Sequence, residues 1–205
     1  MRYHELDGVL SCVPYHVPII RDIIHQFKYN NAALLSKILA DIIAHGIKTI
    51  EKKQKKSFAA YYNRKRVDQY INNPFPPLYA QTIDCVPVPL HVKKQKQRGF
   101  NQALLLARDI VRTIPEARKW NLRDCIVRTR TTLPQAQLDT VDRIHNVRHA
   151  FMLRTHREQR SADTALIIDD VVTSGSSCDE IASLLKKTGY RCVWALSPAY
   201  GHHYA

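Results

Sequence analysis

The sequence predicts an α/β protein, with a parallel sheet flanked by helices and a helical region at its N-terminus. Short apolar runs at 82–88, 164–169 and 191–197 alternate with helical patterns, which is typical of βαβ units. Upstream, apolar residues recur at helical spacing from Ile19 to Ile50. Apolar residues make up 45% and charged residues 24% of the chain, an ordinary globular composition that excludes a disordered or fibrous protein.

The N-terminal part divides into two helices and a basic segment. The helical pattern breaks at 29–31, and Gly46 lies near the end of the second helix. The basic segment, Lys48 to Arg66, carries eight basic residues against the single acid Glu51. A Pro-rich connection at 72–77 follows. We therefore expect a helical, basic region over 1–78 that packs on a core region over 79–205.

The core region alternates strands and helices in chain order. A helix is expected over 101–114, and 125–128 and 150–153 are candidate short strands. The polar stretch between them, 129–146, predicts a long loop, and loops of this length inside a compact domain are usually functional. A further helix is expected over 178–187.

Charge and cysteine usage narrow the class of protein. The 205 residues carry a formal net charge of +13, which suggests a polyanionic partner such as nucleic acid. The five cysteines are far apart, which excludes a disulfide framework and a cysteine-based zinc ribbon. No apolar run approaches the roughly 18 residues of a membrane span, and the first residues lack a signal-peptide profile. We expect a cytoplasmic protein that does not insert into membranes.

The stretch from Ala165 to Ser177 carries the chemistry. Four apolar residues run into Asp169 and Asp170, as at the carboxyl end of a buried parallel strand, where open α/β sheets bind ligands. A turn containing Gly175 and several hydroxyls follows, then a helix, so backbone N–H groups there form an anion site. Ser177 and Glu180 have the spacing of a capping box. The acids favour hydroxyls or a cation and the turn favours a phosphate, a combination that ribose 5-phosphate satisfies.

Two simpler interpretations compete with this one. A Walker phosphate loop needs Gly-Lys-[Ser/Thr], which is absent. An ordinary strand followed by a capped helix explains the pattern without a ligand, but it does not explain the paired acids and the hydroxyls together.

The stretch resembles the motif by which type I phosphoribosyltransferases bind 5-phosphoribosyl 1-pyrophosphate (PRPP). The resemblance implies that the catalytic pair Asp169 and Asp170 holds the ribose diol. It also implies a 5-phosphate site made by the turn residues, which are Thr173, Ser174, Gly175, Ser176 and Ser177. A protein of this class cleaves the bond from C1 of PRPP to pyrophosphate through an oxocarbenium-like state, so catalysis is mostly positioning and charge stabilisation. Mg²⁺ is expected to bind through PRPP oxygens and water, with no direct protein ligand.

Two further segments resemble the signature of ComF-type proteins, which are associated with natural competence. The first joins Val86-Pro87-Val88-Pro89 to Arg98-Gly99-Phe100-Asn101-Gln102 at a helix start. The second runs from Arg128 through Gln135 and Arg143 to Asn146. Arg21, Lys28 and Tyr29 weakly echo an upstream helix of the same family. The resemblance covers about 83–197.

The family pattern assigns expected roles to these segments. Pro87, Arg98 and Gly99 would face the pyrophosphate, and Asn101 would cap the following helix, with Gln102 beside it. Lys93, Lys94 and Lys96 fit either a pyrophosphate partner or a solvated basic loop. The segment 128–146 would form the lid, although Gln135, Arg143 and Asn146 fit a purely structural role equally well. Many ComF-type proteins carry a four-cysteine zinc module, but only Cys12 lies in the first 84 residues, so no zinc is expected.

Two function classes follow from these patterns. One is a phosphoribosyltransferase linked to competence and DNA uptake that releases pyrophosphate. The other is a non-catalytic protein that handles single-stranded DNA and keeps the PRPP site for binding or regulation. Lys48 to Arg66, with interleaved aromatic residues, would hold the single strand, although a solvated helix explains it equally well. Proteins of the competence machinery are the further partners that the resemblance implies.

Overall fold

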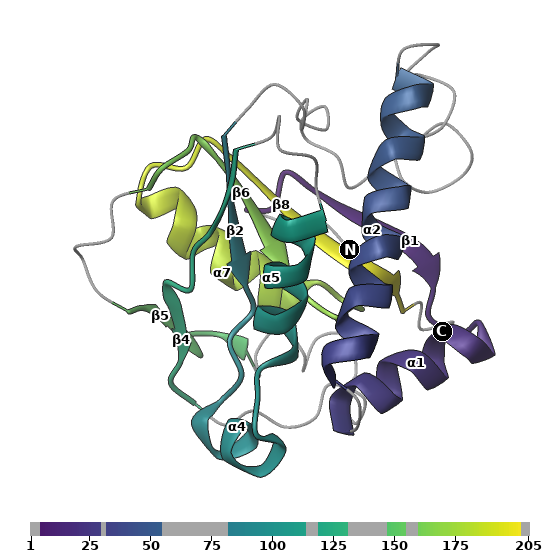
Figure 1. The fold of residues 1–205 in the computed structure, drawn as a ribbon. Coiled ribbons are helices and arrows are strands. Elements are labelled where there is room, and N and C mark those ends of the chain that lie inside the picture. Colours follow the sequence, from purple (N-terminus) through teal and green to yellow (C-terminus); the bar gives the residue numbers. More distant parts are fainter. Residues whose placement is uncertain are drawn as a thin grey trace.

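The computed structural model describes residues 5–29, 32–54, 82–113, 119–130, 147–154 and 160–201 (Figure 1). Within these residues the main sheet is parallel throughout, and β7 (Val171–Val172) extends it beside its long C-terminal strand. Its strand order is β1 (Gly8–Pro14), β8 (Cys192–Tyr200), β6 (Thr164–Ile168), β2 (Ile83–Pro87) and β3 (Trp120–Leu122). A separate antiparallel pair joins β4 (Ile126–Arg128) to β5 (Phe151–Leu153). The predicted α/β fold with a mostly parallel sheet is confirmed.

Helices cover both faces of this sheet. α1 (Pro18–Tyr29), α2 (Ala32–Gln54) and α5 (Gln102–Thr113) lie on one face, and α7 (Ser176–Lys187) lies on the other (Figure 1). Alternate residues of β6 enter the two cores: Leu166 and Ile168 pack with the first group, whereas Ala165 and Ile167 pack with α7. A strand buried on both faces reads as an unbroken apolar run, which is why β6 could be predicted.

Four described elements were absent from the prediction: the two-residue β7 and three others. β1 lies at the edge of the sheet and pairs with β8. The pairing begins with Gly8 beside Trp194 and ends with Pro14 beside Tyr200. β3 lies at the opposite edge, beside β2. α4 (Val92–Arg98) replaces the basic loop that we considered for the lysines there. The N-terminal region thus contributes a strand to the sheet as well as helices. The boundary between 78 and 79 lies outside the described residues.

The second helix extends about one turn beyond its predicted end at Ile50. α2 continues through Gly46 to Gln54. A Cβ at Gly46 would lie only 2.7 Å from Cys12 Sγ, so the glycine lets α2 approach β1 closely. Glycine lowers the stability of a helix interior. Its presence at position 46 is explained by close packing and not by the end of the helix.

Part of the basic segment falls outside the described residues. Its first residues, 48–54, belong to α2, but 55–66 and the Pro-rich connection at 72–77 are not described. Among the helices that the structure describes, each is too short or too polar to cross a membrane.

Candidate functional site

The residues predicted to bind PRPP meet at one edge of the sheet. β2 and β6 are parallel neighbours that end together, with Pro87 beside Ile168. The register continues into the loops, because the Val88 N–H donates to the Ile168 carbonyl at 2.9 Å. Asp169 and Asp170 therefore lie beside the turn that leads into α4 and α5. This is the carboxyl edge, where a parallel sheet leaves room for a ligand.

The two acids form a closely coupled pair. The Asp169 N–H donates to the Leu196 carbonyl at 3.2 Å, and the Asp170 N–H donates to Asp169 Oδ1 at 2.8 Å. Burial raises the pKa of Asp169 well above its usual value, and the charge of Asp170 raises it further. A positive charge near the pair therefore favours the ionised form of Asp169.

The hydroxyl-rich turn leads directly into α7. Gly175 is the N-cap residue, with a left-handed φ of 69° that favours glycine. Ser174 Oγ and Ser176 Oγ lie 2.9 Å apart, and Thr173 and Ser177 flank them. The turn thus brings hydroxyls and helix N-terminal amides together, which suits a phosphate.

The predicted capping box at the start of α7 is wrong. The helix begins at Ser176, and no side chain caps it. Glu180 Oε1 instead accepts a hydrogen bond from the His149 N–H at 2.8 Å. The spacing matched a capping box, but Gly175 takes the N-cap position because the turn needs its positive φ.

The turn between β2 and α5 holds the second group of predicted residues. Asn101 caps α5 as predicted, because its Oδ1 accepts the Ala103 N–H at 3.1 Å. Gly99 ends α4 with a φ of 84°. Gln102 is buried at the start of α5, and its Nε2 has no hydrogen-bond partner among the described residues.

Cationic side chains from three elements lie close to one another, and two of them, Lys28 and Arg128, interact with the acids. Arg98 ends α4 with its guanidinium 5.4 Å from the ring centre of Tyr29. Arg128, on β4, lies at the same distance from the Phe151 ring. Burial lowers the pKa of Arg128, and the charge of Asp169 opposes this. The pKa of Lys94 is lowered by partial burial and then by Arg128, Arg98 and Lys28. We call Lys28, Lys94, Arg98 and Arg128 the cation cluster.

Sequence reasoning missed part of this arrangement. Lys28 Nζ lies 3.2 Å from Asp170 Oδ2. The weak resemblance of Lys28 and its neighbours to the family's upstream helix did not predict this contact. Lys94 is half-buried in α4, whereas Lys93 and Lys96 are exposed, so the solvated alternative fits only those two. The predicted lid residues Gln135, Arg143 and Asn146 lie outside the described residues.

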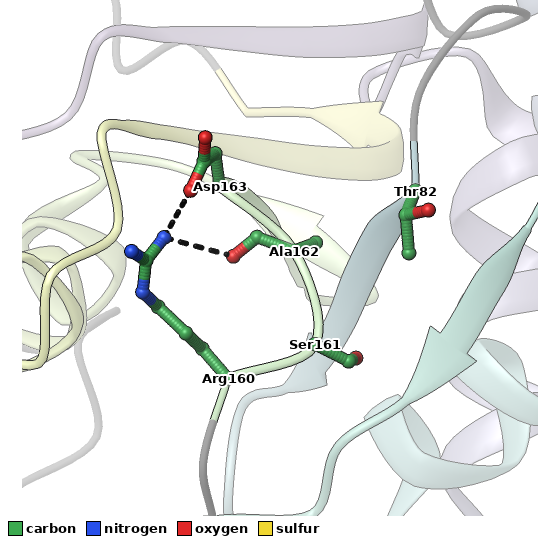
Figure 2. A pocket seen from close by; sticks show the side chains of 5 residues that line it. All are labelled: Thr82, Arg160, Ser161, Ala162 and Asp163. Carbon is green, nitrogen blue, oxygen red and sulfur yellow. Dashed lines mark hydrogen bonds and ion pairs between the residues drawn. The ribbon is translucent and has the colours of Figure 1, made fainter.

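A shallow pocket lies at the opposite ends of the strands, away from the acid pair. It has a volume of about 500 Å³ and lies where β2 and β6 begin (Figure 2). Arg160 in its wall pairs with Asp163 and also donates to the Ala162 carbonyl. Ser161 and Thr82 complete the lining. None of the residues predicted to bind PRPP lines this pocket.

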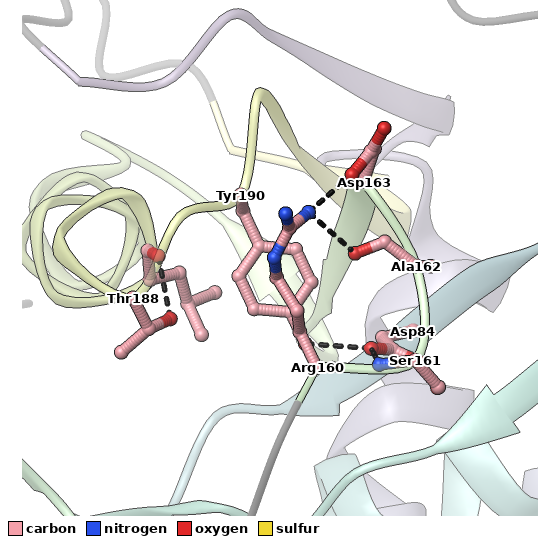
Figure 3. Close-up of polar contacts among 8 residues, drawn as sticks. Asp84, Arg160, Ser161, Ala162, Asp163, Thr188 and Tyr190 are labelled. Atoms are coloured by element: carbon pink, nitrogen blue, oxygen red, sulfur yellow. Dashed lines mark hydrogen bonds and ion pairs between the residues drawn. The ribbon is translucent and has the colours of Figure 1, made fainter.

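Behind this pocket, Asp84 anchors the segment before β6 (Figure 3). Asp84 is fully buried and accepts the Ser161 N–H at 3.0 Å and the Tyr190 hydroxyl at 2.6 Å. The Ser161 hydroxyl also donates to it. These bonds satisfy the carboxylate within the fold, which indicates a structural role.

The chain is similar to bacterial proteins named for competence and DNA use. It is 35% identical to competence protein F of Haemophilus influenzae over 116 residues, 56% of this chain and 49% of that protein. It is 37% identical to DNA utilization protein YhgH of Escherichia coli K12 over 113 residues, 54% of this chain and 47% of that protein.

A longer match extends toward the N-terminus. The chain is 29% identical to DNA utilization protein YhgH of Escherichia coli O6:H1 over 193 residues, 91% of this chain and 70% of that protein. The chain spans about half the length of the first two relatives. No protein-family profile matches it.

Proposed function

Since the chain belongs to the ComF family, we propose that it binds PRPP at the carboxyl edge of its sheet and acts in competence and DNA use. One observation carries the proposal. The acid pair and the hydroxyl-rich turn are contiguous at that edge, and the cation cluster stands beside them. A ligand that carries hydroxyls, a phosphate and a pyrophosphate would match this arrangement. The hydroxyls would bind the acid pair, the phosphate the hydroxyl-rich turn, and the pyrophosphate the cation cluster.

The proposed chemistry is phosphoribosyl transfer on a type I phosphoribosyltransferase-like fold. Asp169 and Asp170 would accept hydrogen bonds from the ribose diol, and the turn from Thr173 to Ser177 would hold the 5-phosphate. Arg98 and the rest of the cation cluster would stabilise the charge that develops on the leaving pyrophosphate. Closing the site would exclude water from the oxocarbenium-like state.

The side chains present fit an indirectly held Mg²⁺. The acid pair supplies hard oxygen donors, but Lys28 already neutralises Asp170, and Mg²⁺ usually keeps several waters. The ion would therefore come with the PRPP oxygens and add charge neutralisation there.

Calorimetry with PRPP and Mg²⁺ tests the site. The Asp169→Asn/Asp170→Asn variant removes both charges and keeps the side-chain shapes, so it is expected to fold and to lose PRPP binding. Asp41→Asn, which neutralises an exposed carboxylate on α2, is the control. An unchanged affinity in the double variant would overturn the assignment. Pyrophosphate release with a panel of bases and amines then separates turnover from binding.

The second candidate function is single-stranded DNA handling that keeps the PRPP site for regulation. The names of the relatives and the net charge of +13 favour it. Changing Lys52, Lys53, Lys55 and Lys56 to Gln is expected to weaken single-strand binding and to flatten its dependence on salt, by about 0.7 in slope for each lost phosphate contact. PRPP affinity serves as the control, and an unchanged slope rejects DNA binding by these lysines.

A further inference from the structure

The carboxyl end of α1 contacts both turns of the proposed PRPP site. Lys28 reaches Asp170, whereas Phe27 lies against Phe100 with ring centres 6.4 Å apart. Tyr29 lies under the Arg98 guanidinium. Three consecutive residues of one helix thus join the acid pair to the turn before α5.

The ion pair at Lys28 is well shielded from water. Its side chain is 29% exposed and that of Asp170 is 15% exposed, with 3.2 Å between Nζ and Oδ2. The charge of Asp170 raises the pKa of Lys28, although burial opposes this. Shielding makes the interaction stronger than that of a surface pair.

The acid pair needs this positive charge. Burial and the mutual repulsion of the two acids favour a proton on Asp169, and Lys28 acts against both. The electrostatic neighbours of these groups come from all the elements packed around them. They are Tyr15 after β1, Lys94 on α4, Arg128 on β4, and Cys178 on α7.

We propose that Lys28 is a positioning residue, the resident counter-cation of the acid pair: its ion pair with Asp170 holds that carboxylate in place, and its positive charge offsets part of the negative charge that the pair carries. A ligand's hydroxyls then meet acids whose mutual repulsion is already reduced. The identity of that ligand rests on the proposed function, whereas the coupling of charges within the chain does not.

An anchoring role for Lys28 predicts a different outcome. α1 is already fixed to the core by Ile20, Ile24 and Phe27, which are buried. Loss of an anchor would weaken ligand binding equally at every pH. Loss of a counter-cation raises the pKa of Asp169, so it weakens binding most at low pH and progressively less as Asp169 ionises.

The experiment measures PRPP affinity against pH by calorimetry, with Mg²⁺ present. Lys28→Met is expected to bind PRPP about tenfold more weakly than the unaltered protein at the acidic end of the range, and the difference is expected to narrow as the pH rises. Lys28→Arg keeps the charge and is expected to retain the original profile. Lys37→Met, which removes an exposed lysine from α2, is the control. An equal loss at all pH values, or no loss at any, overturns the proposal.

A second measurement needs no ligand. Carbon-13 NMR titration follows the carboxyl group of Asp169 in the free protein, assigned with the Asp169→Asn variant. Lys28→Met is expected to move the titration of Asp169 to higher pH, and an unchanged titration overturns the inference even if PRPP binds. If the unaltered protein does not bind PRPP but the titration moves, the proposed function fails and the counter-cation stands.

Discussion

The side chain of Asn101 donates to the Val88 carbonyl across 3.1 Å and so closes the turn between β2 and α5. Its oxygen at the same time caps α5 through the Ala103 N–H. Both motif segments of the turn, the Val-Pro pair and the Arg-Gly-Phe-Asn run, therefore depend on one buried amide.

Replacing Asn101 with Ala is expected to lower the free energy of unfolding by about 1–3 kcal/mol. The substitution removes the helix cap and leaves the Val88 carbonyl without its donor. Urea unfolding measures the loss. Asn121→Ala removes an exposed hydrogen bond, from Asn121 Nδ2 to Ser161 Oγ, and should cost clearly less. Equal costs would show that the Asn101 bonds contribute little.

The sequence sufficed for those parts of the site that are contiguous along the chain. β6, the acid pair and the hydroxyl-rich turn follow one another directly, so their order alone predicted their placement. Asn101 could be identified as a cap because capping is a local interaction. The start of α7 was misjudged by local spacing, since the backbone conformation of Gly175 decided it.

Long-range contacts could not be predicted in this way. β1 is an edge strand whose partner, β8, lies at the other end of the chain, so no local pattern reveals the pairing. Lys28 and Asp170 meet only because α1 packs across the sheet edge. A glycine such as Gly46 is typical of a helix end, but its place in α2 is explained by the close approach of Cys12.

Arg128 is expected to contribute strongly to PRPP affinity. Arg128→Gln should weaken binding about tenfold to a hundredfold, since a hydrogen bond to a charged group contributes about 1.5–3 kcal/mol. The loss should diminish at high salt, because screening weakens the interaction that the variant removes. Arg112→Gln, on an α5 side chain that is 76% exposed, should bind normally. A loss of equal size in both variants would indicate a general charge effect.

The Tyr190 hydroxyl is expected to stabilise the fold in a pH-dependent way. Tyr190→Phe should cost about 1–3 kcal/mol near neutral pH, because Asp84 loses a buried donor. Burial and the hydrogen bond to Asp84 raise the pKa of Tyr190 in the folded state. Its contribution is therefore complete below the unfolded value of about 10 and is lost as the pH rises beyond it.

Unfolding free energies from neutral pH to about pH 11 check this expectation. The difference between the unaltered protein and Tyr190→Phe should narrow above about pH 10. Tyr29→Phe removes the hydroxyl of a tyrosine that is 62% exposed and should show no comparable trend. A constant difference across the range would contradict the raised pKa.

Gly175→Ala separates the conformation of the phosphate turn from the overall stability of the fold. Alanine at a φ of 69° costs about 1–2 kcal/mol, so the turn is expected to rearrange and the N–H groups at the start of α7 to lose their alignment. Affinity for ribose 5-phosphate, which lacks the pyrophosphate, should therefore fall. Gly189→Ala imposes a similar cost at a φ of 97°, at the far end of α7, and should leave that affinity unchanged. Calorimetry and urea unfolding on both variants test whether the turn is a phosphate site. Equal destabilisation of the two variants, with loss of binding only in Gly175→Ala, supports the site. Normal binding by Gly175→Ala rejects it.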